Sequence, residues 1–191
     1  MKRTLMSVAF AVVAALTVAG CGSDTDSNDS TASNGAQFND ADVAFAQSMI
    51  PHHEQAVEMA TMAQERASST EVKQLADKIA AAQGPEIDTM TGWLEDWGQE
   101  VSSDSMGGMD HSGGDMPGMM SDTDMESLGA ATGAEFDQMF LQMMIEHHTG
   151  AIEMAQTEQQ DGENPDAIGL AEKIEADQTA EIAQMEDLLG S

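Results

Sequence analysis

The chain contains an internal repeat in which each residue of the second copy lies 95 positions after its partner, from Asp42 and Asp137 onward, without a gap. The motif Met-x-x-His-His begins at Met49 in the first copy and at Met144 in the second. The matched pairs include Phe45 and Phe140, His52 and His147, His53 and His148, Met59 and Met154, Lys78 and Lys173, Gln83 and Gln178, Glu86 and Glu181, and Met90 and Met185. A repeat of this kind indicates that one supersecondary unit has been duplicated, so we expect two copies of one helical hairpin.

Apolar residues follow a helical period in both copies, which indicates amphipathic helices. We therefore predict an all-α protein with a four-helix bundle. Residues 38–97 form the first hairpin, residues 132–190 form the second, and 38–190 together make one domain. The period is lost over residues 98–131, which are rich in Gly, Ser, Asp and Met, so this segment is expected to be a flexible loop.

Residues 1–21 have the composition of an export signal, with two basic residues ahead of an apolar run from Leu5 to Ala19. The run leads into Gly20 and Cys21 in a pattern that resembles a bacterial lipobox, so Cys21 is the predicted lipidation site. The alternative is an ordinary signal peptide with a chance cysteine. Residues 22–37 are polar and are expected to be a disordered tether. Together these features predict a lipoprotein anchored to the outer face of the bacterial cell membrane.

The chain is strongly acidic, with 35 Asp and Glu against 6 Lys and Arg and a net charge of −29. Loss of residues 1–21 would remove Lys2 and Arg3 and make the net charge −31. Such a charge repels phosphate, which excludes nucleic acid as a partner and leaves the lipid anchor as the only expected membrane contact. A cation is the natural ligand, although much of the charge also serves solubility.

The repeated histidines fall on the apolar face of their helices, with His52 one turn after Met49 and His147 one turn after Met144. One interpretation is that they are hydrogen-bonded core histidines packed beside methionine. The other is a metal centre, in which thioether and imidazole ligands together select Cu(I), or the related Ag(I). The candidate ligands are Met49, His52, His53, Met59, Met144, His147, His148 and Met154. Glu86 and Glu181, with Gln83 and Gln178, are expected to orient histidine N–H groups, or alternatively to cap a hydrated polar layer with no metal. Glu58 and Glu153, further from the apolar stripe, are also candidates to support the ligands.

The predicted loop is a second source of soft ligands. A methionine exposed in a loop gains nothing from packing, so these residues are candidate metal ligands in their own right. They are Met106, Met109, His111, Met116, Met119, Met120 and Met125. A low-complexity linker without metal is the alternative.

The two motifs, Met-Ile-Pro-His-His-Glu-Gln-Ala-Val-Glu-Met-Ala from Met49 and Met-Ile-Glu-His-His-Thr-Gly-Ala-Ile-Glu-Met-Ala from Met144, resemble the domain-of-unknown-function family 305. The Gln-x-x-Glu-Ile-x-x-Met segments from Gln83 and Gln178 are similar to that family's second and fourth helices. The resemblance spans about residues 38–190. It implies a ferritin-like four-helix bundle in exported bacterial proteins, some of which are implicated in copper binding and tolerance.

Three classes of function remain open on this basis. The favoured one is a non-enzymatic, extracytoplasmic lipoprotein that sequesters or passes on Cu(I) and supports metal tolerance. The others are a metal-dependent redox enzyme and a structural or partner-binding bundle without metal. The sequence shows no nucleophile–base arrangement, phosphate loop or Cys-based zinc spacing, and it does not identify a protein partner.

Overall fold

The structure is a computed structural model that describes residues 37–101 and 116–190. Residues 1–36, 102–115 and 191 lie outside it, and with them the export signal, Cys21, nearly all of the tether, Met106, Met109 and His111. The helices are α1 (Asp40–Arg66), α2 (Thr70–Asp96), α3 (Asp122–Ala130), α4 (Ala134–Asp161) and α5 (Pro165–Gly190). The predicted all-α class is confirmed. None of the described helices combines the length and apolar composition needed to cross a membrane.

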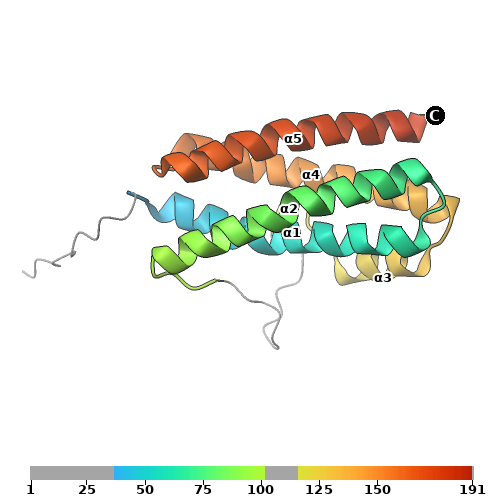
Figure 1. The fold of residues 1–191 in the computed structure, drawn as a ribbon, viewed down its shortest axis with the longest axis horizontal. Helices are drawn as coiled ribbons and strands as arrows, with labels where there is room; N and C mark the ends of the chain where they lie inside the picture. The colour runs from blue at the N-terminus through green and yellow to red at the C-terminus, as the bar shows by residue number, and fades with distance from the viewer. Residues whose placement is uncertain (1–36, 102–115, 191) are drawn as a thin grey trace, which may run out of the picture. The chain divides into compact units, whose positions relative to one another are not determined.

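The four long helices form the predicted ferritin-like bundle of two hairpins, with the short α3 against one end (Figure 1). Helix α1 packs on α2, α4 packs on α5, and the hairpins meet mainly where α1 faces α4. Asn39 caps α1 by accepting hydrogen bonds from the backbone N–H groups of Ala41 and Asp42. Helix α5 begins at Pro165 behind Asn164, whose side chain accepts from two N–H groups of the first turn.

Two aspartates related by the repeat fix how the hairpins meet. The Asp42 carboxylate, at the start of α1, accepts backbone N–H groups of Glu163 and Asn164 from the loop between α4 and α5, at 3.2 and 2.9 Å. Asp137, at the start of α4, does the same for Ser68 and Ser69 between α1 and α2, both at 3.0 Å. Each hairpin thus holds the loop of the other, and α1 and α4 run antiparallel.

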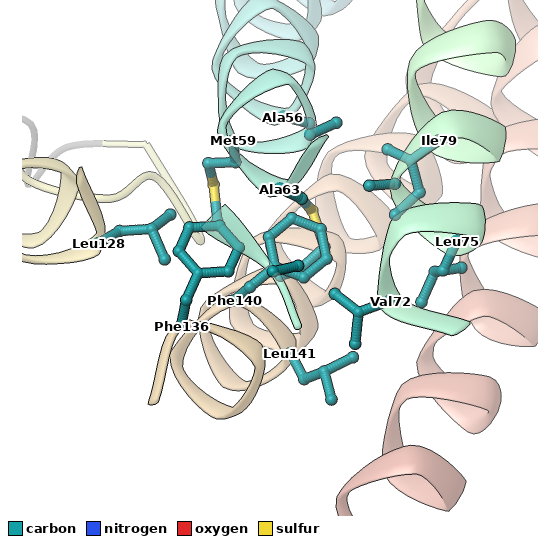
Figure 2. Packing of buried hydrophobic residues seen from close by; sticks show 14 of the residues in the cluster. Ala56, Met59, Ala63, Val72, Leu75, Ile79, Leu128, Phe136, Phe140 and Leu141 are labelled. Carbon is teal, nitrogen blue, oxygen red and sulfur yellow. The ribbon is translucent and has the colours of Figure 1, made fainter. Parts of the chain in front are cut away.

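Hydrophobic side chains fill both ends of the bundle. In one cluster Phe136 and Phe140 of α4 point toward α1, where they meet Met59 and Ala63, with Leu128 of α3 alongside (Figure 2). The second cluster, at the other end, gathers residues such as Phe45, Met49, Met90, Leu94 and Ile174. The buried histidines lie between the two clusters along α1 and α4.

The expectation of one flexible loop over residues 98–131 is wrong for its second half. Residues 121–130 are ordered because Ser121 and Asp124 form a capping box that starts α3. Leu128 is fully buried in the first cluster, Met120 is nearly so, and Met125 packs against it. Since burying these side chains stabilises the segment by the hydrophobic effect, Met120 and Met125 are packing residues rather than exposed loop ligands.

The clamp at Asp137 predicts a specific loss of stability. We expect Asp137→Ala to lower the free energy of unfolding by about 2 kcal/mol, because charge-assisted hydrogen bonds to Ser68 and Ser69 are lost. Glu135→Ala is the matched control, since Glu135 is also an acidic residue of the first turn of α4 but is exposed. Urea unfolding of both variants measures the difference. Equal losses would mean that Asp137 acts only through the helix dipole.

Candidate metal centre

The paired histidines of the two repeats come together where α1 crosses α4. The rings of His52 and His147 lie with their centroids 3.7 Å apart, tilted by 36°. His53 and His148 occupy the neighbouring positions, and all four side chains are fully buried. The antiparallel arrangement set by the two aspartates brings the equivalent positions of the repeat face to face.

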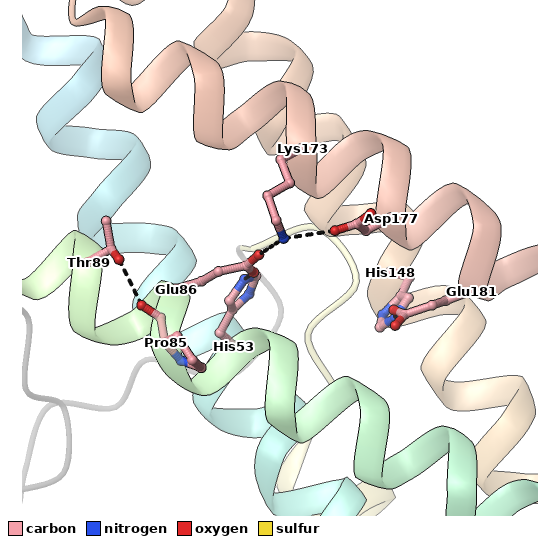
Figure 3. A network of polar contacts seen from close by, with 8 residues as sticks. All are labelled: His53, Pro85, Glu86, Thr89, His148, Lys173, Asp177 and Glu181. Carbon is pink, nitrogen blue, oxygen red and sulfur yellow. Dashed lines mark hydrogen bonds and ion pairs between the residues drawn. The ribbon is translucent and has the colours of Figure 1, made fainter.

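Repeat-related carboxylates hold the outer pair of histidines. His53 Nε2 lies 2.9 Å from Glu86 of α2, and His148 Nε2 lies 2.7 Å from Glu181 of α5. Figure 3 shows Lys173 reaching across from α5 to Glu86, with 2.8 Å between Nζ and Oε1. Burial would raise the pKa of Glu86, but the hydrogen bonds from His53 and Lys173 outweigh it and lower that pKa, so the group is ionised.

A short segment, residues 116–120, crosses over the central pair, and we call it the strap. Its Pro117 carbonyl oxygen lies 3.1 Å from His52 Nε2. Gln55 binds the strap at Met120, donating to its carbonyl at 2.9 Å and accepting from its N–H at 2.8 Å. These contacts join residues 65 positions apart and were not predicted from the sequence.

Two glycines let the strap approach α4. Gly118 has a φ of +76°, and a Cβ on Gly150 would lie 2.0 Å from the Pro117 carbonyl oxygen. Gly150 is the repeat partner of Gln55, the residue that binds the strap from α1. This mismatch between the two copies of the motif was a sequence signal for the strap, since the strap can lie on only one of the two copies.

The hydrogen bonds fix which histidine nitrogens remain available. A carbonyl or carboxylate oxygen can only accept, so Nε2 carries the proton in His52, His53 and His148. The Nδ1 atom of each of these rings is buried without a hydrogen-bond partner, and His147 has none at either nitrogen. Three rings therefore present the same lone pair, oriented by a partner on the far side, as metal-binding histidines do.

Burial keeps the central imidazoles neutral. Desolvation, with the nearby His53 adding to it, lowers the pKa of His52 to about 3. Desolvation, and next the closeness of the His52 ring, also put the pKa of His147 well below its usual value. Burial lowers the pKa of His53, although its hydrogen bond to Glu86 opposes the shift. Neutral imidazole is the form that binds metals.

Two buried amides, one helical turn before Glu86 and Glu181 on α2 and α5, also lack partners. Gln83 has none at either side-chain atom, and Gln178, its repeat partner, has none at its oxygen. Most buried polar atoms in proteins are hydrogen-bonded, so a concentration of orphans indicates a partner from outside the chain, such as an ion or water. Within residues 37–101 and 116–190, no three His, Cys, Asp or Glu side chains are arranged to hold a metal ion. An ion here would need thioether ligands as well.

The structure separates the predicted methionine ligands. Met49 and Met144 are fully buried one helical turn from the central histidines. Met59, also buried, packs among the phenylalanines of the first cluster, and Met154 lines a pocket beside Phe45. Each lies seven residues from its own histidine, or about 10 Å along the helix. They are therefore not beside the histidine pair.

Of the four carboxylates predicted to support the histidines, two lie beside them and two do not. Glu86 and Glu181 lie at histidine nitrogens, as expected. The predictions for Glu58 and Glu153 are wrong, because both side chains are exposed on the outer faces of α1 and α4. The two adjacent histidines of each helix occupy its buried face, and Glu58 and Glu153 lie outside this face, on the side toward solvent.

Comparison with known proteins was made on both sequence and structure. The sequence profile of a domain of unknown function, DUF305, matches residues 42–189. A search among curated proteins finds no match. The structure of a DUF305 protein from Streptomyces coelicolor, described as a candidate secreted protein, is 37% identical with a TM-score of 0.71, covering 78% of this chain and 92% of that one. A DUF305 fragment from Deinococcus radiodurans is 30% identical with a TM-score of 0.71, covering 80% and 97%.

Structures of the protein CopM are similar as well. Its Cu(I)-bound form is 33% identical with a TM-score of 0.63, covering 77% of this chain and 94% of that one. CopM has also been solved with Cu(II) and with silver.

The neutral central histidines predict a pH dependence of stability. Between pH 6.5 and about 3 the unfolded chain binds a proton at His52 that the folded chain does not, so stability falls as the pH falls through this window. We expect the free energy of urea unfolding of the metal-free protein to depend less steeply on pH in this window when His52 is replaced in His52→Gln. The slope should fall by up to about 1.4 kcal/mol per pH unit. Other titrating groups are common to both proteins. The slopes should coincide above pH 7, and equal slopes below pH 6 would contradict the assignment.

Proposed function

The chain belongs to the DUF305 family, and on this premise we propose that it is a copper-binding protein that holds Cu(I) through histidine and methionine between its two hairpins. The observation that supports this proposal best is the set of buried, oriented imidazoles of His52, His53 and His148, whose Nδ1 atoms have no hydrogen-bond partner. Cu(I) is a soft ion that favours imidazole and thioether, and its binding would satisfy these atoms. The CopM structures with Cu(I), Cu(II) and silver support the same ion class.

The proposed ligands of this centre are the central residues of the repeat. His52 and His147 would bind through ring nitrogens, and the fully buried Met49 and Met144 would add thioethers from one turn away. His53 and His148 would add nitrogens oriented by Glu86 and Glu181. Ag(I), with the same preference for soft ligands, is expected to compete for the centre.

Burial favours binding over catalysis. A redox enzyme must bring a substrate, or an electron-transfer partner, to its metal, whereas all four imidazoles are fully buried. Sequestration of Cu(I), or slow transfer to another carrier, needs only that the ion enter and leave. We therefore propose a buffering or carrier role that supports metal tolerance, with no catalytic residues.

We also propose that the protein works outside the cytoplasm, anchored by a lipid on Cys21. The apolar run of residues 5–19 followed by Cys21 supports export and lipidation. The likeness to the Streptomyces coelicolor protein agrees with export. Nucleic acid is not a partner because the chain is so acidic.

Removal of the central imidazoles tests the proposal. We expect the double variant His52→Ala with His147→Ala to weaken Cu(I) binding at least tenfold, because each ring supplies a ligand. Competition with a chromophoric Cu(I) chelator measures it, and circular dichroism checks that the helix content is retained. Glu58→Ala with Glu153→Ala is the control, since both side chains are exposed on the same helices. Unchanged Cu(I) affinity, or tighter binding of Zn(II) than of Cu(I), would contradict the proposal.

The methionines between the hairpins are proposed as a separate Cu(I) pool. We expect deletion of residues 104–114, which removes Met106, Met109 and His111, to reduce the Cu(I) bound per chain. Thioethers do not titrate in the physiological range, so they still bind Cu(I) at a pH that protonates histidine. The copper that the deletion variant fails to bind should therefore be the copper that the wild-type protein retains on acidification. The deletion stops short of the strap and α3, whose Met120 and Leu128 pack in the core. Unchanged stoichiometry measured by metal analysis would make this segment a linker only.

A further inference from the structure

A pocket of about 270 Å³ lies between the first half of α1 and the second half of α4, below the strap. It exists because the repeat is broken there. Its wall on α1 is made by Ala41, Ala44 and Ser48, and the second copy has Phe136, Met139 and Met143 at the matched positions. At the other end of the α1–α4 seam, Phe136 is fully buried in the hydrophobic cluster. The first copy therefore carries small residues where the second fills the same space.

A second break in the repeat puts a carboxyl group into this pocket. Glu158 lines it and is 1% exposed, whereas its partner in the first copy is the core residue Ala63. Gly162 takes the place of Ala67, and a Cβ on Gly162 would lie 2.3 Å from Glu158 Oε1. Gly162 has an ordinary φ of −71°, so the backbone does not require glycine. Glycine there makes room for the Glu158 side chain.

The fold does not need this carboxyl group. No N–H group donates to either oxygen of Glu158, and its polar neighbour is another carboxyl group, Asp42, with which it shares a hydrogen bond. Burial, the hydrogen bond to Asp42 and the charge of Asp42 raise the pKa of Glu158 to about 8, so Glu158 carries a proton near neutral pH. At the matched end of the bundle, Asp137 clamps its loop beside Ala63 without any such group. Since the matched end of the bundle is built without this buried acid and the space that Gly162 makes for it, the acid has a use other than clamping the loop.

Two thioethers complete the lining. Met116 comes from the strap and Met154 from α4, and both are partly exposed, so these long side chains have room to turn. We infer that this pocket is a second site for a soft monovalent cation, Cu(I) or Ag(I), bound by Met116, Met154 and the Glu158 carboxylate. Thioethers select the soft ion, and Glu158 would release its proton to solvent as the ion binds, so that its carboxylate balances the charge of the ion in a buried place. The inference takes its choice of ion from the proposed function, but none of its ligands is a histidine.

The site is tested by filling it and by removing its ligands, in the full chain. Ser48→Met restores the residue of the second copy and fills the pocket without touching a ligand. Met116→Leu with Met154→Leu removes the thioethers at nearly constant volume, and Glu158→Gln removes the carboxyl group that would ionise when the cation binds. We expect each variant to lose about one Ag(I) or Cu(I) ion per chain or to bind it at least tenfold more weakly. Met59→Leu, the repeat partner of Met154 in the core, should retain wild-type stoichiometry.

The histidine variant separates this inference from the proposed function. In a chain that lacks residues 104–114 and carries His52→Ala with His147→Ala, the ion that remains should show sulfur and oxygen neighbours by X-ray absorption, and Ser48→Met added to that background should remove it. Loss of ions only in the pocket variants would uphold this site and overturn the histidine centre. Wild-type binding in all three pocket variants, with helix content unchanged, would overturn the pocket site and leave the histidine centre standing. A variant that loses helix content is replaced in the comparison by the other two.

Discussion

The reciprocal hold of two aspartates on the loops of opposite hairpins is the constraint on which the rest of this bundle depends. Asp42 and Asp137 accept backbone N–H groups from matched positions, Glu163 and Asn164 in one loop and Ser68 and Ser69 in the other. Because each bond joins the start of one hairpin to the turn of the other, the pair sets both the direction and the register of α1 against α4. Hydrophobic packing alone would tolerate a slide along the helices, whereas fixed N–H partners do not.

That register decides what meets at the centre. With α1 and α4 antiparallel about a pseudo-two-fold axis, the middle of each repeat faces the middle of the other, so His52 lies against His147. The outer histidines then fall within reach of carboxylates on α2 and α5. Four imidazoles buried in this way need partners for every polar atom, and the chain supplies them for only one nitrogen of each of three rings. The unfilled lone pairs are the chemical basis of the proposed copper centre.

Departures from the repeat are as informative as the repeat itself. Gln55 and Gly150 differ because the strap binds one and presses on the other. The small side chain of Ala41 leaves room for a pocket, whereas Phe136 fills the space at the matched position. Glu158 occupies the position at which the first copy has the core residue Ala63. A symmetric scaffold explains why matched residues are alike. It gives no reason for these differences, so each of them points to something that occurs on only one side of the molecule.

The amino-acid sequence by itself determined the all-α class, the two hairpins, the burial of the repeated histidines and the approach of Glu86 and Glu181. All of these follow from helical periodicity and duplication, which act locally along the chain. It misplaced Glu58 and Glu153, which share the helices of the histidines but lie on their outer faces. It also missed α3 and the strap, since their order comes from burying Leu128 and Met120 against helices distant in the chain. Only the tertiary structure decided that Pro117 orients His52 and that Glu158 shares a pocket with Met154, because these contacts join segments whose meeting depends on how the hairpins dock.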